Sequence, residues 1–195
     1  MPSLPLLRLA DRLTDGVVLL DAHTLEDAQA HLAGADEEIR LRFDEGRTAS
    51  LEETRGALAR WIAARATGGP MFAYALRSPE GTLMGGCEIR LVEEGLANIS
   101  YWVFPDFRRR GLGVRAVRLL IEAARGVQGL RRIEAHVAPD NLASRRLAQA
   151  LGLREAGAVE ETSWSGSVST MIRYVAELSP APGFGTASDG GPSPR

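Results

Sequence analysis

Cysteine is scarce in this sequence of 195 residues, and so are clusters of metal-binding side chains. Cys87 is the single cysteine, which excludes an intramolecular disulfide and favours a reducing compartment. Its neighbours Gly85, Gly86 and Ile89 indicate a small buried side chain rather than a nucleophile. No Cys, His and Asp spacing typical of a metal site is present, so we expect no metal ion.

Long apolar runs and a strong net charge are also missing. Without a run of about 18 apolar residues or a secretory signal, we expect a cytoplasmic protein that has no membrane anchor. The formal net charge of -2 argues against a general nucleic-acid binder. Hydrophobic residues make up 45% of the chain and charged residues 25%, which is typical of a globular protein with a core.

The composition changes near residue 179. Residues 179–195 consist mainly of Ser, Pro, Gly and Ala, which cannot build a packed core, so we expect a disordered tail there. The preceding residues have the size and composition of one domain, and we expect a single domain over 1–178.

Hydrophobic periodicity predicts strands and helices that combine into a mixed α/β sheet. The predicted strands cover 17–20, 71–76, 83–91, 99–103, 133–137, 153–159 and 169–175. The predicted helices cover 24–34, 51–67 and segments beginning at 113 and 141, with a short helical turn within 36–43. Capping boxes mark two of the helix starts, Thr24 with Asp27 and Ser50 with Glu53. The second, third and fourth strands are expected to form an antiparallel meander.

One stretch in the middle of the chain combines a strand, a loop with glycines and a helix. Pro105 ends the strand, and from Gly113 onward the apolar residues follow a helical period. The three consecutive arginines at 108–110 therefore lie at a helix N-terminus, where each cation is unfavourable by roughly 0.3–1 kcal/mol. An anion on the loop removes this penalty, and Gly111 and Gly113 let backbone N–H groups approach it closely. The pattern favours a pyrophosphate-binding loop; a solvated basic turn is the alternative.

Two sequence blocks resemble the GNAT superfamily of acyl-CoA-dependent N-acetyltransferases. Arg108-x-x-Gly111-x-Gly113 is similar to the family's Arg/Gln-x-x-Gly-x-Gly/Ala signature, whose amides hold the coenzyme A pyrophosphate. The segment 141–153 is similar to the family's Asn-x-x-Ser/Ala…Leu-Gly-Phe segment, in the same order along the chain.

The resemblance extends over roughly residues 15–176 and is strongest over 99–153. The Asn-x-x-Ser form of the second block and the pair Tyr101-Trp102 look most like the branch of ribosomal-protein N-terminal acetyltransferases, RimJ and RimL. The resemblance implies an α/β (α+β) fold: a mixed, mostly antiparallel sheet that splays open at its central strands, is flanked by helices and binds acetyl-CoA in the cleft.

The same resemblance assigns the acetyl-CoA site to particular residues. Backbone groups near Val103 and Phe104 would hold the pantetheine arm and the thioester, and an amide there would stabilise the oxyanion. Asn141 would bind the pantetheine region or an ordered water; a plain helix N-cap is the alternative, and both can be true. The residues that would hold the diphosphate are Arg108, Arg109, Arg110, Gly111, Leu112, Gly113 and Val114.

Attack of an amine on a thioester requires removal of one proton and delivery of another. Many family members have a tyrosine general acid where this chain has Ala148, so Ser144 is the candidate acid, with water or unassisted thiolate departure as alternatives. Glu88 on a central strand is the candidate base, since partial burial raises the pKa of a carboxyl group; a solvent-facing glutamate is the alternative. His136 can also titrate, although a histidine on the polar side of a strand is more typical of a surface.

The predicted function is transfer of an acetyl group from acetyl-CoA to a protein N-terminal α-amine or a small amine. An acidic cluster could attract such an amine or could be a solvated face; it consists of Asp36, Glu37, Glu38, Asp44 and Glu45. The alternatives are a longer acyl-CoA as donor, and a non-catalytic acyl-CoA sensor or partner-binding module. Nucleic-acid binding through the arginines is a distant alternative, and association into a homodimer stays open.

Overall fold

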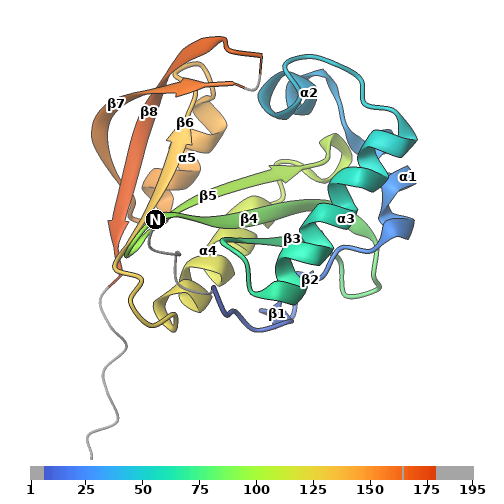
Figure 1. Cartoon of the computed structure of the whole chain (residues 1–195), viewed down its shortest axis with the longest axis horizontal. Coiled ribbons are helices and arrows are strands. Elements are labelled where there is room, and N and C mark those ends of the chain that lie inside the picture. Colours follow the sequence, from blue (N-terminus) through green and yellow to red (C-terminus); the bar gives the residue numbers. More distant parts are fainter. Residues whose placement is uncertain (1–6, 164, 179–195) are drawn as a thin grey trace, which may run out of the picture.

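The computed structural model describes residues 7–163 and 165–178 (Figure 1). Its strands are β1 (Leu13–Thr14), β2 (Leu19–Asp21), β3 (Met71–Arg77), β4 (Leu83–Glu93), β5 (Leu96–Val103), β6 (Arg132–Val137), β7 (Arg154–Thr162) and β8 (Val168–Glu177). They form one sheet in the order β1-β2-β3-β4-β5-β6-β8-β7. Neighbouring strands are antiparallel except β5 and β6, which run parallel. The expected mixed, mostly antiparallel sheet is confirmed, and the predicted tail at 179–195 lies outside the described residues.

Helices cover both faces of this sheet (Figure 1). They are α1 (Ala28–Gly34), α2 (Glu37–Phe43), α3 (Leu51–Thr67), α4 (Leu112–Arg125) and α5 (Leu142–Ala150). The capping box that predicted α3 is present, since Ser50 Oγ accepts from the Glu53 N–H at 3.1 Å and the Glu53 carboxylate accepts from the Ser50 N–H at 2.7 Å. The helix predicted from Thr24 begins as a 3-10 turn, Leu25–Asp27, which continues into α1.

Side-chain alternation along the central strands divides the interior into two clusters. Tyr74, Cys87 and Ile99 belong to the larger cluster, beneath the apolar face of α4. Trp102 and Phe104 belong to the smaller cluster, on the side of α1 and α3. Strands β3, β4 and β5 therefore each contribute to both layers, and the loop that follows β5 starts from a buried anchor.

The sheet opens between its two central parallel strands. β5 pairs with β6 only from Leu96 to Asn98, although β5 continues to Val103 and β6 continues to Val137. Beyond Asn98 each strand remains paired with its outer neighbour, β4 or β8, so the two halves of the sheet separate without losing their own ladders. This arrangement confirms the expected splay and leaves backbone groups of β5 facing a gap.

Gly85 shows why β4 needs glycine beside this gap. Its φ is 154°, and a Cβ atom there would collide with the carbonyl oxygen of Trp102 on β5. The pairing of β3 with β4 shifts register between Leu76 and Arg77 in the same region. The bulge or close backbone approach predicted at Gly85 is therefore confirmed.

Candidate active site

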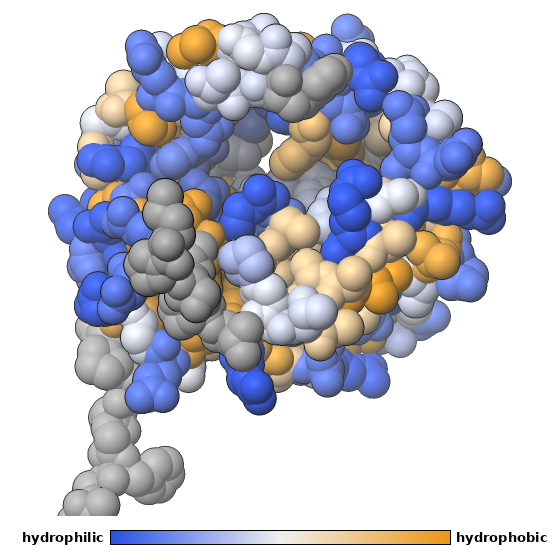
Figure 2. All heavy atoms as spheres, viewed as in Figure 1, coloured by the Kyte–Doolittle hydropathy of each residue, from blue (hydrophilic) through white to orange (hydrophobic). Residues whose placement is uncertain are grey.

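Two adjoining cavities lie where β5 and β6 separate, and Figure 2 shows a hollow on this face between the β6–β8 side and α2. The larger, about 480 Å³, lies against the loop between β5 and α4, and the smaller, about 350 Å³, reaches β4, β6 and β7. The residues that line both are Arg42, Phe43, Tyr101, Asn141, Ser144 and Leu147. The candidate cofactor loop and the candidate acid therefore border one continuous cleft.

The loop between β5 and α4 lines the larger cavity and contains a row of backbone N–H groups that form no hydrogen bond with described residues. Within the described residues, no protein acceptor pairs with the N–H groups of 109–114. Arg109 and Gly111 have φ values of 60° and 74°, which bend the chain into a concave turn just before the helix. A non-glycine residue in this left-handed region costs about 1–2 kcal/mol, and such strain is typical of functional loops. The row of donors at a helix N-terminus is suited to an anion.

The guanidinium group of Arg108, which also lines the larger cavity, is bound by acceptors of the protein itself. Its Nε donates to the Val103 carbonyl at 2.9 Å, and its terminal nitrogens donate to Asp36 at 2.7 and 2.9 Å and to Glu38 at 2.9 Å. Its own backbone N–H donates to the Pro105 carbonyl. This arrangement braces the loop against α2. The contact of Arg108 with the diphosphate, which the family resemblance implies, stays a prediction.

Charge pairing also explains the titration of Asp36. Burial alone would raise the pKa of this carboxyl group, but hydrogen bonds from Arg108 and from the Ile39 N–H outweigh burial and lower the pKa below its usual value. Of the other acidic residues in this region, Glu45 accepts from the Ser165 hydroxyl at 2.9 Å. The acidic cluster is thus partly engaged in internal contacts rather than forming a free acidic face.

The remaining arginines of the loop differ in direction. Arg110 folds back, donating to the Asp106 carbonyl at 2.7 Å with its guanidinium 5.7 Å from the centre of the Phe107 ring. Arg109 lines the larger cavity, and so does Arg146 of α5. Neither Arg109 nor Arg146 has an ion-pair partner in the part of the chain that the structure describes. Sequence reasoning missed Arg146, because its position on the cavity side of α5 is set by tertiary packing.

The backbone of β5 turns polar groups toward the gap. The Phe104 N–H donates to the Met84 carbonyl at 2.8 Å, so alternation along an antiparallel strand turns the N–H groups of Tyr101 and Val103 away from β4. Phe104 is 4% exposed and lines neither cavity, and its N–H is already bonded. Val103 therefore offers the free amide of the predicted pair, and Phe104 anchors the loop in the core.

Gly113 has a packing function in the first turn of α4. A Cβ atom at this position would lie 3.1 Å from the Tyr101 ring and 3.3 Å from Leu147. The glycine therefore lets α4 approach β5 and α5 closely, while Leu112 is buried and Val114 lines the larger cavity.

Asn141 and Ser144 meet at the start of α5. The Asn141 side-chain oxygen accepts from the Ser144 N–H at 3.0 Å, which confirms the predicted N-cap. The Ser144 hydroxyl lies 2.9 Å from the Tyr101 hydroxyl. Burial raises the pKa of Tyr101, while the hydrogen bond with Ser144 acts in the opposite direction, and the net shift is upward. The phenol is therefore neutral near pH 7.

Both titratable candidates for the base line the smaller cavity with Ser144. The Glu88 side chain is 13% exposed and its carboxylate accepts from Arg90 at 2.9 Å. His136 lies between Glu161, at 2.5 Å from its Nδ1, and Glu134, at 3.3 Å from its Nε2. Hydrogen bonds that the protonated imidazole donates to these glutamates, above all to Glu161, raise the pKa of His136 against the effect of burial. His136 is half-buried beside the cleft, contrary to the surface position typical of its pattern.

In the described part of the chain, no helix is long and apolar enough to cross a membrane. Nor does any group of three or more His, Cys, Asp or Glu side chains, within the same ranges, form a potential metal site. Cys87 is fully buried and burial raises its thiol pKa strongly, which is unsuited to a nucleophile.

Comparisons with known proteins agree with this geometry. The sequence profile of the acetyltransferase (GNAT) domain matches residues 18–154. No curated protein sequence matches the chain significantly.

Many solved structures share the fold. One is RimL, a ribosomal alpha-N-protein acetyltransferase in complex with coenzyme A (TM-score 0.71, 18% identity, 85% of this chain and 96% of that chain covered). Another is Mycobacterium smegmatis RimJ in complex with a CoA-disulfide (0.65, 21%, 87% and 86%). A third is a chimera of the spermidine N-acetyltransferase SpeG from Vibrio cholerae (0.67, 18%, 83% and 95%).

Proposed function

Because the chain belongs to the family of acetyltransferase (GNAT) domains, we propose that it transfers an acetyl group from acetyl-CoA to a primary amine by direct attack in a ternary complex. The acceptor is the α-amine of a protein N-terminus or a small amine. One observation carries the proposal: the gap between β5 and β6 has unpaired N–H donors at one end and a serine–tyrosine hydroxyl pair on its wall.

The donor site follows from the row of N–H groups at 109–114. These donors and the cations of Arg109 and Arg146 bind the diphosphate, since backbone amides at a helix N-terminus and guanidinium groups both favour phosphate oxygens. The backbone of Tyr101 and Val103 holds the extended arm along the open side of β5. Arg108, Gly113 and Phe104 support the loop from behind.

Proton transfers are divided between the walls of the cleft. The Val103 N–H faces the gap and stabilises negative charge on the carbonyl oxygen. Glu88, or His136 with its glutamate partners, accepts the proton of the amine from the smaller cavity. Ser144 delivers a proton to the departing thiolate. The Tyr101–Ser144 pair offers a hydroxyl proton that Ala148 cannot supply, and this supports an enzyme over a non-catalytic sensor.

An acetylation screen tests this function. Purified protein is incubated with acetyl-CoA and either peptides with free N-termini, the same peptides with blocked N-termini, or a polyamine and an aminoglycoside. Free thiol and product mass are both measured. The chain contains no lysine, so its own side chains add no acetylated amine to the readout.

We expect thiol release that depends on an unblocked amine. Stabilisation by acetyl-CoA without thiol release from any acceptor would instead indicate a sensor. Faster turnover with a longer acyl-CoA would reassign the donor, and failure of acetyl-CoA to bind would remove the proposal altogether.

A further inference from the structure

Tyr101 and Ser144 come from different segments of the chain and bring their hydroxyl groups together. Tyr101 belongs to β5 and Ser144 to α5, and their oxygens lie 2.9 Å apart on the wall common to both cavities. Of the residues that line both cavities, these are the ones with hydroxyl groups. The pair therefore borders the space in which the proposed function places the thioester.

The surroundings hold both residues in place. The Tyr101 ring packs over Gly113, where a Cβ atom would lie only 3.1 Å away. The backbone of Ser144 is fixed by its hydrogen bond to the Asn141 side chain. Ala148, one turn further along α5, is 2% exposed and has no hydrogen-bonding side chain. The geometry of the pair is therefore rigid, and Ser144 has no second partner from its own helix.

Hydroxyl chemistry decides the direction of the hydrogen bond. Each hydroxyl has one hydrogen and can accept at its lone pairs, so one member of the pair donates and the other keeps its hydrogen for a different acceptor. The phenol is the more acidic of the two and is the better donor. When Tyr101 donates, the hydrogen of Ser144 is free to point into the cleft.

We propose that Tyr101 is a positioning residue that acts through Ser144: its phenol donates to the Ser144 oxygen and directs the serine hydrogen toward the sulfur of the coenzyme. The inference rests on the proposed function. When the carbon–sulfur bond breaks, the sulfur takes the proton of Ser144, the serine oxygen takes the phenolic proton, and solvent reprotonates Tyr101. The proton that the amine loses balances the one that solvent supplies.

The test needs no acceptor, because the sulfur itself is the probe. Dissociation constants for coenzyme A and for desulfo-coenzyme A are measured by calorimetry at pH 9, where part of the free thiol is ionised and accepts a hydrogen bond strongly. We expect the wild-type protein to prefer coenzyme A by about 3- to 10-fold, the value of one hydrogen bond. The preference should vanish in Tyr101→Phe and in Ser144→Ala, and the double variant should lose no more than either single variant.

A matched control separates this effect from general damage. Tyr74→Phe also removes a buried phenol, which donates to the Ala10 carbonyl at 2.6 Å, and Tyr74 lines neither cavity. This variant should keep the wild-type preference. Three outcomes would each overturn the inference. Tyr101→Phe could weaken the binding of both compounds equally, it could leave the preference unchanged, or it could cause a further loss of preference when combined with Ser144→Ala. Failure of both compounds to bind the wild-type protein would instead contradict the proposed function.

Discussion

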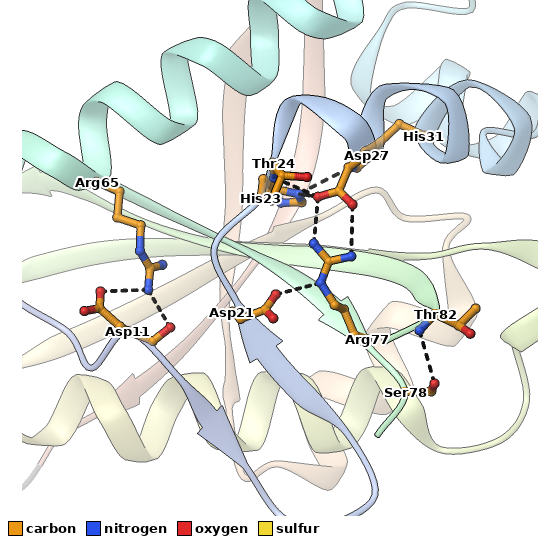
Figure 3. A network of polar contacts seen from close by, with 10 residues as sticks. All are labelled: Asp11, Asp21, His23, Thr24, Asp27, His31, Arg65, Arg77, Ser78 and Thr82. Carbon is orange, nitrogen blue, oxygen red and sulfur yellow. Dashed lines mark hydrogen bonds and ion pairs between the residues drawn. The ribbon is translucent and has the colours of Figure 1, made fainter. Parts of the chain in front are cut away.

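Arg77 and Arg108 each bind a pair of carboxylates, in two regions that differ in exposure. Arg77 on β3 binds Asp21 through Nε at 2.8 Å and Asp27 through both terminal nitrogens at 2.9 and 2.7 Å (Figure 3). Its side chain is 12% exposed and lines neither cavity. The Arg108 side chain is 30% exposed, lines the larger cavity and binds carboxylates that are more exposed than Asp27.

Exposure decides what each arginine contributes. Removing one partner of a buried ion pair leaves an uncompensated charge, whereas exposed pairs contribute about 0–1 kcal/mol. Burial would raise the pKa of Asp27, but hydrogen bonds from Arg77 and from the Thr24 N–H lower it overall. The Arg77 region therefore holds α1 to the sheet, while the Arg108 region determines the shape of the cleft.

The largest expected effect is on the free energy of unfolding, when Arg77 is removed. Arg77→Ala leaves Asp27 buried without its cation, so the free energy of unfolding in urea should fall by about 3–5 kcal/mol. The dissociation constant for coenzyme A, measured on the folded fraction, should not change. A binding loss as large as that of a cleft variant would contradict the separation of the two regions.

The next largest effect concerns Arg109 and Arg146, which line the larger cavity and have no ion-pair partner among the described residues. Arg109→Ala and Arg146→Ala should each weaken coenzyme A binding by about 10- to 100-fold, since each removes a charge-assisted hydrogen bond. Arg110→Ala is the matched control, because its guanidinium contacts the Asp106 carbonyl instead of the cavity. Equal losses in all three variants would mean that overall positive charge, rather than this geometry, drives binding.

The pH dependence of stability probes the interior beside Arg77. Burial is the main cause that lowers the pKa of His23 to about 3 and that of His31 to about 4. Their depressed folded pKa values mean that the unfolded chain takes up protons first, below about pH 6.5. The free energy of unfolding should therefore fall on acidification from pH 6.5 to 4.5, by about 1.4 kcal/mol per pH unit for each histidine.

His136 changes stability in the other direction and in another window. Its folded pKa is raised, so its contribution is complete below about pH 6.5 and is lost as the pH rises through the folded value.

The variant His31→Gln tests the acid side, where it should reduce the slope of stability against pH by about half. An unchanged slope in this variant would show that other groups cause the acid sensitivity.

The smallest expected effect on stability is that of Arg108→Ala. Because this side chain and its partners are partly exposed, the free energy of unfolding should fall by about 1 kcal/mol or less. Coenzyme A binding should nevertheless weaken by about threefold, since the loop loses its brace on α2. Asp36→Asn should produce the same pattern. A lower free energy of unfolding with unchanged coenzyme A binding would instead assign Arg108 to stability alone.

Local features of the site could be predicted from the sequence, and contacts between distant segments could not. The strand, the glycine loop and the helix N-terminus around Gly111 are consecutive, and periodicity and backbone preference determine them. The Tyr101–Ser144 pair joins residues 43 positions apart, and Arg108 reaches partners 70 and 72 positions away. No spacing rule encodes such contacts, so the arginine run predicted an anion site but not which guanidinium faces it.

The short pairing of β5 with β6 also sets a dimension. Because the strands part after Asn98, the open stretch from Ile99 to Val103 offers roughly 17 Å of backbone to an extended arm. The closed end of this slot is the hydrogen-bonded pairing of β5 with β6, so the slot can lengthen only if those hydrogen bonds break. An added pair at Ile99 and Ala135 would shorten the slot by about 3.3 Å, so the point at which the two strands separate determines how much open backbone remains for that arm.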